Sequence, residues 1–139
     1  MTAAYTTEAL STGDGRNGRT VVQDSSLDFT MNAPKEMGGN GEGVNPEQLF
    51  AAGYAACFHS ALKAVAKSKK ADVTDSAVGA RVTLNKGSEG FFLSVVLEVT
   101  IPGITPEDAQ ALADAAHETC PYSKATRGNI DVTVTVAED

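Results

Sequence analysis

The residues best suited to chemistry in this sequence are two cysteines, Cys57 and Cys120. A cysteine reacts as its thiolate, and at an unperturbed pKa of about 8.5 only about 3% of a thiol is ionised at pH 7. Cys57 lies deep inside a predicted helix, where burial raises the pKa of a thiol. A reactive Cys57 therefore needs a cation beside it. Arg16, on a glycine-rich loop, is a candidate, although a solvated turn residue is the simpler interpretation of it.

Other polar residues near the cysteines have structural explanations. His59 is two positions from Cys57 and should point away from it, so a structural or solvent-facing role is expected. His117, one helical turn before Cys120, is within reach of it, but a packed, hydrogen-bonded histidine is the expected role. Glu47 suits the first turn of a helix, where the dipole favours an acidic residue. Its offset from Cys57 corresponds to about 15 Å of helix rise, more than a glutamate side chain can reach. Glu47 would therefore act through a long arginine or from a neighbouring subunit.

Neither a metal site nor a phosphate site is expected. Two cysteines so far apart are too few for zinc without other ligands. The glycines of residues 13–18 are not followed by the Gly-Lys-Ser/Thr of a phosphate-binding loop. Each cysteine lies on the apolar stripe of its own predicted helix, so two small core residues are the alternative to a reactive pair. In a reducing compartment any pairing between them would be transient.

Length and composition predict one globular domain over residues 1–139. The chain is 42% hydrophobic and 21% charged, and its net charge of −7 argues against nucleic acid or an anionic membrane as a partner. No basic region followed by an apolar stretch opens the chain, so we expect a cytoplasmic location. The most apolar segment, 49–66, contains His59 and Lys63 and is rich in alanine, as expected for a buried helix rather than a membrane span.

Periodicity predicts an α+β domain in the order βββ-α-ββ-α-β, with antiparallel sheets around a nearly apolar central helix. Asn45 as N-cap and Pro46 at the first helical position mark the start of that helix, which should fray near residues 67–70. Its apolar positions are expected to be Leu49, Phe50, Gly53, Ala56, Cys57, Ser60, Ala61, Ala64 and Val65.

The remaining strands and the second helix are predicted from apolar–polar alternation and from residues that start or end a helix. Strands are predicted at 5–12, 20–22 and 27–32, an alternating hairpin at 78–101 and a last strand at 130–136. The second helix should begin at Thr105-Pro106 and end at Pro121, because proline cannot continue a helix.

Two segments resemble a known family. Residues 45–58 (NPEQLFAAGYAACF) and 115–129 (AAHETCPYSKATRGN) closely resemble the two cysteine motifs of the organic hydroperoxide resistance proteins, the thiol peroxidase branch of the OsmC/Ohr family. The loop at 15–19 (GRNGR) and the stretch at 37–39 (MGG) are also similar to that branch, so the resemblance covers essentially the whole chain. The Cys-Pro-Tyr-Ser sequence at 120–123 favours the hydroperoxide branch over its OsmC sister.

The resemblance implies a role for each candidate residue. Cys57 would be the peroxidatic cysteine and Cys120 the resolving one, with Arg16 activating the thiolate and Glu47 orienting Arg16. The implied reaction reduces an alkyl or lipid hydroperoxide to its alcohol through a Cys57 sulfenic acid and a Cys57–Cys120 disulfide. A dithiol then reduces the disulfide, and the family's usual reductant is a lipoylated protein carrying dihydrolipoamide. No bound cofactor and no metal are implied.

The family fold is an intertwined homodimer with active sites at the subunit interface, which would answer the reach problem of Glu47. This chain departs from the family pattern in two places. The loop is one residue longer between Tyr5 and Arg16, which leaves Arg19 as the alternative activating arginine. His59 and Ser60 replace a more apolar pair, a change expected to alter packing or substrate preference.

Two other function classes compete with the peroxidase. A redox sensor would use the same cysteines but needs an output surface such as a DNA-binding helix, and both the charge and the topology argue against one. A non-catalytic ligand-binding member of the fold would keep an apolar pocket without requiring both cysteines, and here both are present in full motif context.

Overall fold

The computed structural model describes residues 1–137 of the chain. These residues form six β-strands, three α-helices and two short 3-10 helices. Contacts divide the chain into two compact units, one ending at Leu49 and the other beginning at Phe50. Each unit is described by itself below. The predicted single domain over 1–139 remains a prediction, and its last two residues lie outside the described part.

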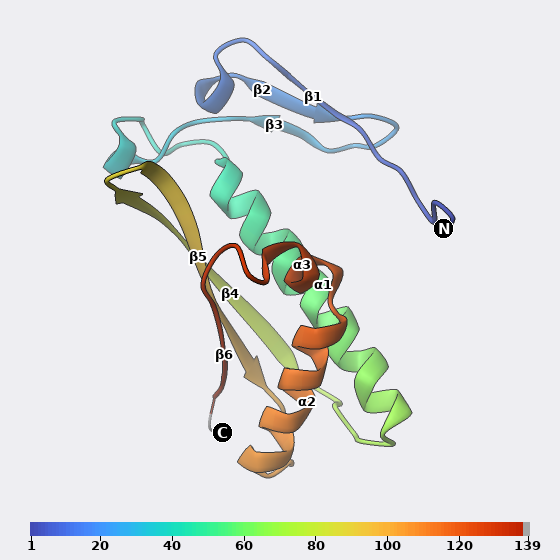
Figure 1. Cartoon of the computed structure of the whole chain (residues 1–139). Helices are drawn as coiled ribbons and strands as arrows, with labels where there is room; N and C mark the ends of the chain where they lie inside the picture. Colours follow the sequence, from blue (N-terminus) through green and yellow to red (C-terminus); the bar gives the residue numbers. More distant parts are fainter. Residues whose placement is uncertain (138–139) are drawn as a thin grey trace. The chain divides into compact units, whose positions relative to one another are not determined.

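The first unit contains a small antiparallel sheet in the order β1-β2-β3, drawn in blue in Figure 1. Its strands are β1 (Ala9–Thr12), β2 (Arg19–Val22) and β3 (Asp28–Thr30). The outer strands are shorter than predicted. Met31, expected inside the third strand, instead forms an isolated parallel bridge with Val44. Two 3-10 helices, η1 (Gly15–Asn17) and η2 (Lys35–Met37), occupy the loops after β1 and β3.

The second unit is built on a mixed sheet in the order β4-β5-β6. β4 (Ala77–Gly87) and β5 (Gly90–Thr100) form the predicted antiparallel hairpin, with Ala77 opposite Thr100. β6 (Val132–Val136) pairs with β5 in parallel, so the expectation of purely antiparallel sheets is wrong. The connection from β5 to β6 runs through helices, and a helical crossover is the connection that lets consecutive strands pair in parallel.

Helix α1 (Pro46–Ser68) starts as predicted. The Asn45 side chain accepts a hydrogen bond from the Gln48 N–H (2.8 Å), and the Gln48 side chain accepts one from the Asn45 N–H (2.9 Å). This reciprocal pair is a capping box, which satisfies two amide groups that the helix itself leaves unpaired. Asn45 is therefore confirmed as the N-cap.

The buried face of α1 differs from the predicted stripe. Ala56, Ser60 and Ala64 are exposed. The buried positions are Tyr54, Phe58, Ala61, Leu62, Val65 and Ala66. Large side chains remove more apolar area from water than alanine or serine does, so the face that carries them turns toward the core.

The chain turns twice around the second cysteine. Helix α2 (Pro106–Thr119) begins as predicted, with the Thr105 hydroxyl accepting from the Asp108 N–H at 3.2 Å. It ends one residue before Cys120, whose backbone is extended (ψ 125°) because proline disfavours a helical conformation in the residue before it. Pro121 then occupies the first position of a further helix, α3 (Pro121–Thr126), which the sequence analysis missed.

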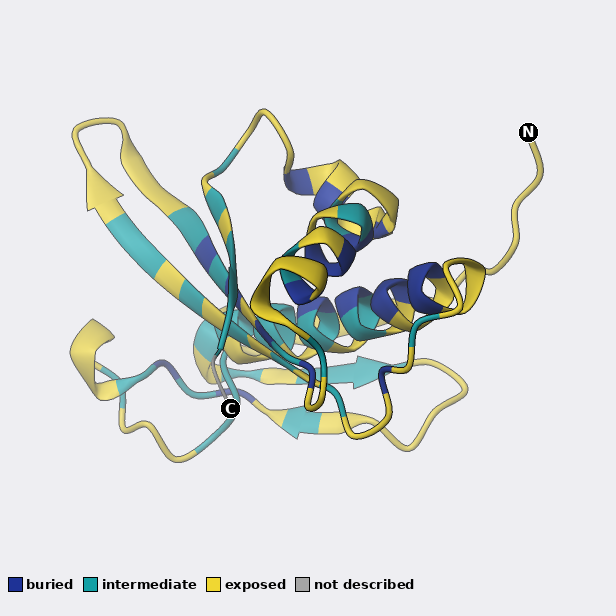
Figure 2. Cartoon of the chain, turned by 90° about the horizontal axis from the view of Figure 1, so that it is seen from below, coloured by how far each residue is buried: buried dark blue, intermediate teal, exposed yellow. Residues whose placement is uncertain are grey.

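The core of the second unit lies between its sheet and its helices. α1 and α2 cover one face of the sheet, and the buried positions face inward in Figure 2. β5 contributes Val95, Leu97 and Val99, as its alternation predicts. By length and composition α1 is apolar enough to cross a membrane. Tyr54 and Leu62 are nevertheless fully buried in this core, which is the environment expected of a core helix.

Candidate active site

The sulfur atoms of Cys57 and Cys120 lie 3.6 Å apart, with the Cys120 thiol donating to the Cys57 sulfur. Both cysteines are free, Cys120 fully buried and Cys57 partly exposed. A disulfide needs a sulfur separation of about 2.05 Å, so the structure holds two thiols one short movement from a bond. Of the two cysteines, Cys57 is thus the residue more accessible to a dissolved molecule.

The turn between α2 and α3 presents Cys120 to α1. The Cys120 N–H donates to the Ala116 carbonyl at 2.8 Å, and the Cys120 carbonyl accepts from the Lys124 N–H at 3.0 Å. Cys120 thus closes α2 and opens α3, so its extended backbone is held from both sides. Cys57 is held by its place inside α1.

The surroundings of Cys57 oppose its ionisation. Burial raises the pKa of the Cys57 thiol, and the neighbouring Cys120 thiol raises it further. The backbone N–H of Tyr122 donates to the Cys57 sulfur and lowers the pKa, without cancelling the effect of burial. The predicted rise in the pKa is confirmed, and the need for a nearby cation follows from it.

The predicted arginine and glutamate form one ion pair in the first unit. Arg16 Nη1 lies 2.6 Å from Glu47 Oε1, and Arg16 Nη2 lies 3.2 Å from Glu47 Oε2. Two parallel bonds of this kind fix the plane of a guanidinium. The Glu47 carboxylate also raises the pKa of Arg16, so the side chain keeps its positive charge.

Backbone contacts hold the loop that carries Arg16. The Asn17 side chain accepts a hydrogen bond from the Ala33 N–H at 3.1 Å, and the Gly18 carbonyl accepts one from the Met31 N–H at 2.9 Å. Any side chain at position 18 would collide with the Thr12 carbonyl oxygen. The loop therefore requires glycine at this close approach of two backbone segments.

Arg19 has a different partner. Its Nε and Nη2 atoms donate to the two carboxylate oxygens of Asp28 at 2.9 and 2.6 Å. The pair is exposed and links β2 to β3, and Arg19 holds the pKa of Asp28 below its ordinary value. Of the two arginines weighed in the sequence analysis, Arg16 is thus the one that pairs with Glu47.

Three aromatic rings gather on the elements that carry the sulfurs. Phe50 packs edge-on against Tyr54 with ring centroids 5.8 Å apart and stacks with Tyr122 at 6.3 Å. Tyr54 and Tyr122 lie 5.7 Å apart. A side chain at Gly53 would approach the Tyr122 hydroxyl at 3.0 Å, so the absence of one leaves room for this ring.

A buried polar network on the helices around Cys120 was not predicted from the sequence. The Ser123 hydroxyl lies 2.8 Å from the Tyr54 hydroxyl and 2.7 Å from His117 Nδ1, and the Tyr54 hydroxyl also lies 3.1 Å from Thr126 Oγ1. His117 is packed and hydrogen-bonded, as predicted. Tyr54 on the apolar helix could have indicated this network, because a buried tyrosine hydroxyl usually has a hydrogen-bond partner.

His59, predicted to be structural or solvent-facing, lies with its Nε2 atom 3.0 Å from the Ser76 hydroxyl. Within residues 1–137, no cluster of three or more histidine, cysteine or acidic side chains is arranged to hold a metal ion.

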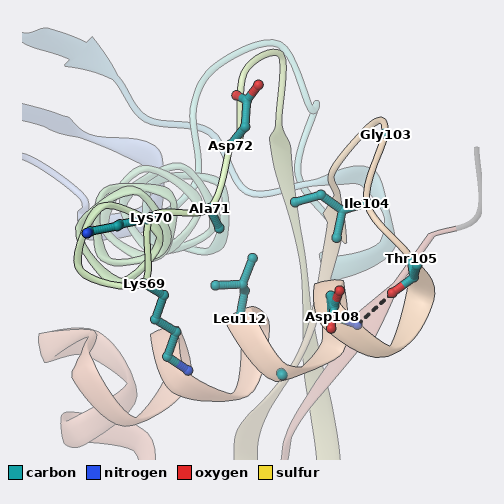
Figure 3. Close-up of a pocket in the computed structure, with 10 residues that line it drawn as sticks. Lys69, Lys70, Ala71, Asp72, Gly103, Ile104, Thr105, Asp108 and Leu112 are labelled. Atoms are coloured by element: carbon teal, nitrogen blue, oxygen red, sulfur yellow. Dashed lines mark hydrogen bonds between the residues drawn. The ribbon is translucent and has the colours of Figure 1, made fainter.

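A cavity of about 480 Å³ opens between the C-terminal end of α1 and the N-terminal end of α2 (Figure 3). Its lining residues are Lys69, Lys70, Ala71, Asp72, Gly103, Ile104, Thr105, Asp108, Ala111 and Leu112. None of the four predicted site residues is among them. The predicted site residues are instead the sulfur pair of the second unit and the Arg16–Glu47 pair of the first unit.

Comparison with known proteins places these features in a family. The model of the OsmC-like proteins matches residues 39–135. An organic hydroperoxide resistance protein from Xanthomonas axonopodis pv. citri is 49% identical over 96% of this chain and 94% of its own length. The crystal structure of such a protein from Legionella pneumophila is 46% identical and covers 99% of this chain and 100% of its own, with a TM-score of 0.94.

A relative from Vibrio cholerae is 45% identical and matches 98% of this chain and 94% of its own with a TM-score of 0.90. Its crystal structure contains captopril in one of the active sites.

Proposed function

Because the chain belongs to the OsmC-like family, in its organic hydroperoxide resistance branch, we propose that it is a cysteine-based peroxidase acting on organic hydroperoxides. The observation that carries the proposal is the 3.6 Å separation of one partly exposed and one buried thiol. Two thiols so placed can supply the two electrons that reduction of one hydroperoxide requires, and become a disulfide as they do so.

In the first step the Cys57 thiolate attacks the terminal oxygen of ROOH. An S–O bond forms, the O–O bond breaks, and the alkoxide leaves and takes a proton to become ROH. Cys57 is thereby oxidised to the sulfenic acid and the hydroperoxide is reduced to the alcohol.

In the second step the Cys120 sulfur attacks the Cys57 sulfenic acid. A disulfide forms, and the sulfenic oxygen leaves with two protons as water, which protects Cys57 from further oxidation. A dithiol then returns both cysteines to thiols and itself becomes a disulfide. We propose dihydrolipoamide on a lipoylated protein as that reductant. Captopril is a thiol, so its presence in the active site of the Vibrio relative supports access of a small thiol to sites of this kind.

We assign activation of Cys57 to Arg16. Burial within the second unit raises the pKa of the Cys57 thiol, so a cation is required to favour the thiolate. A guanidinium close to the sulfur would favour this anion. Arg16 is held flat and charged by Glu47 and can donate to peroxide oxygens as charge develops on them. The proposal places these residues in a homodimer, as the family resemblance implies.

Organic hydroperoxides are the proposed substrates for a physical reason. The rings of Phe50 and Tyr122 stack on the elements that carry the two sulfurs, and apolar surface of this kind binds an alkyl chain at about 25 cal/mol per Å² buried. Hydrogen peroxide has no such chain. A cytoplasmic location, where thiols stay reduced, suits this chemistry.

Intact mass spectrometry after one equivalent of cumene hydroperoxide tests the assignment. The wild-type protein should lose two hydrogens as the disulfide forms. Cys120→Ser should gain one oxygen on Cys57, and a second equivalent should take this sulfenic acid to the sulfinic acid, whereas Cys57→Ser should consume no peroxide. A Cys120→Ser protein that gains no oxygen would show that the roles of the cysteines are wrong.

Steady-state turnover with different peroxides and thiols defines the substrate and the reductant. Turnover should be faster with cumene hydroperoxide than with hydrogen peroxide, and faster with dihydrolipoamide than with glutathione. Equal rates with the two peroxides would contradict the proposed role of the apolar surface.

A further inference from the structure

A buried chain of hydroxyl groups, together with His117, links α1, which carries Cys57, to α2 and α3, which flank Cys120. Tyr54 and Ser123 are fully buried, and Thr126 is 5% exposed. The Ser123 hydroxyl lies between Tyr54 and His117, and the Tyr54 hydroxyl lies between Ser123 and Thr126. Within residues 1–137, every buried side-chain nitrogen and oxygen atom has a hydrogen-bond partner, so this network is fully satisfied. Networks of this kind hold side chains in one arrangement.

Counting protons gives the network a direction. Thr126 has one hydroxyl proton and donates it to the Ser123 carbonyl at 3.1 Å, so toward Tyr54 it acts as an acceptor. The Tyr54 hydroxyl therefore donates to Thr126 and accepts from Ser123. Ser123 has then used its only proton, and it accepts from His117. The result is a one-way series of donors that requires a proton on His117 Nδ1.

Tyr54, His117 and Ser123 each lie three positions from a cysteine in the sequence. Tyr54 is three positions before Cys57 on α1, and His117 is three positions before Cys120 on α2. Ser123 is three positions after Cys120 on α3. Residues three apart lie on the same side of a helix. Each helix that carries or flanks a cysteine thus contributes at least one member of the network, and α3 contributes both Ser123 and Thr126.

We propose that Tyr54, Ser123 and His117 are positioning residues that hold Cys120 in reach of the Cys57 sulfenic acid. The inference rests on the proposed function, in which these two cysteines form a disulfide. Closing the gap from 3.6 Å to a bond requires the turn between α2 and α3 to present Cys120 in one orientation. The network joins both ends of that turn, through His117 and Ser123, to the helix that carries Cys57.

Single-turnover kinetics test the proposal, with peroxide consumption and disulfide formation followed separately. Tyr54→Phe and Ser123→Ala should slow disulfide formation at least about tenfold, because small misplacements of reacting atoms cost large factors in rate. Peroxide consumption in the first turnover should stay within about threefold of wild type. With excess peroxide, both variants should accumulate more Cys57 sulfinic acid than the wild type does.

Matched variants separate positioning from general destabilisation. Thr119 directly precedes Cys120, and its exposed hydroxyl bonds only to the Ala115 carbonyl. Thr119→Ala should therefore behave as wild type. His117→Asn keeps an N–H donor and should retain most of the disulfide rate, whereas His117→Leu should lose it. If Tyr54→Phe fails to fold, the His117 pair carries the test at a half-buried position.

The outcomes distinguish failure of the proposed function from failure of the positioning role. A wild-type protein that forms no disulfide refutes the proposed function itself. Normal disulfide formation in wild type, Tyr54→Phe, Ser123→Ala and His117→Leu overturns the positioning role alone. Two-bond ¹H–¹⁵N correlation spectra should show the proton of neutral His117 on Nδ1, and a proton on Nε2 would overturn the one-way network.

Discussion

Arg16 donates two hydrogen bonds to the carboxylate of Glu47, which follows it by 31 positions in the chain. This is a fork-to-fork arrangement, in which the planes of the two groups and not only their charges are matched. The contact joins a glycine-rich loop to the first turn of α1. Two such bonds fix the plane of the guanidinium before any substrate arrives.

Arg16→Ala should lower the second-order rate with cumene hydroperoxide by about two decades, the scale of losing one preorganised charge. Arg16→Lys should restore only part of the rate, because an ammonium lacks the planar fork. Glu47→Ala should cost less than Arg16→Ala, since the arginine would keep its charge and lose only its orientation. Stopped-flow measurement of the first turnover checks these values.

Arg19→Ala is the control for this series. Arg19 pairs with Asp28 and not with Glu47, so its removal should leave the rate near that of wild type. An Arg19→Ala variant as damaged as Arg16→Ala would show that the activating arginine is misplaced.

The peroxide reaction should become faster as pH rises, because only the thiolate of Cys57 reacts. Burial raises the pKa of this thiol, and the proposed role of Arg16 is to lower it. In Arg16→Ala the midpoint of the pH–rate profile should therefore move to higher pH by about one to three units. A profile that keeps its midpoint while its amplitude falls would indicate that Arg16 acts on the peroxide and not on the thiol.

Gly53 and Tyr122 should be energetically coupled. In an exposed helix, replacing glycine with alanine stabilises by about 1 kcal/mol. At Gly53 the new methyl group would approach the Tyr122 hydroxyl at 3.0 Å and a ring carbon at 3.2 Å. Gly53→Ala should therefore stabilise the protein more in a Tyr122→Ala background than in the wild type. Urea unfolding of the four proteins of this cycle measures the difference, and strict additivity would show that the ring moves aside freely.

The protein should be a dimer at micromolar concentration. Ala52, Ala56 and Ala64 of the apolar helix α1 are exposed in the single chain, so this surface is available to a second copy. Sedimentation equilibrium should give about twice the chain mass of 14.4 kDa. A stable monomer would contradict the placement of the active sites at a subunit interface.

Much of the local structure was predictable from sequence because it depends on near neighbours. The capping of α1 at Asn45 and the alternation of β5 both follow from residues a few positions apart. The parallel pairing of β6 was not predictable in this way, because strand direction depends on how the intervening helices return the chain. The buried face of α1 was misplaced for a related reason. Small residues fit a helical stripe as well as large ones do, and only packing against the sheet selects between them.

The candidate site likewise has features that sequence motifs predict and features that depend on tertiary structure. The roles of Cys57 and Cys120 rest on motifs, but their 3.6 Å separation depends on tertiary structure. The hydroxyl network was missed because Ser123 lies 69 positions from Tyr54. Neither residue type signals chemistry by itself, and only the fold brings them together.

His117 should make the protein less stable in mild acid. Burial lowers the pKa of His117 and nearby Arg127 lowers it further, while Glu118 and Asp114 act in the opposite direction. The folded protein thus takes up this proton at lower pH than the unfolded chain, whose histidine pKa is about 6.5. The stabilising contribution is complete above that value and is lost as pH falls through the region between the two pKa values.

Urea unfolding of the wild type and His117→Asn at pH 7.5 and 5.5 measures this contribution. Asparagine keeps a donor for Ser123 but does not titrate. The free energy of unfolding should therefore fall less between the two pH values in His117→Asn than in the wild type. His59→Asn is the matched control, because His59 also bonds to a serine hydroxyl, at Ser76. If His117→Asn and the wild type lose the same stability on acidification, the pKa of His117 is not lowered in the folded protein.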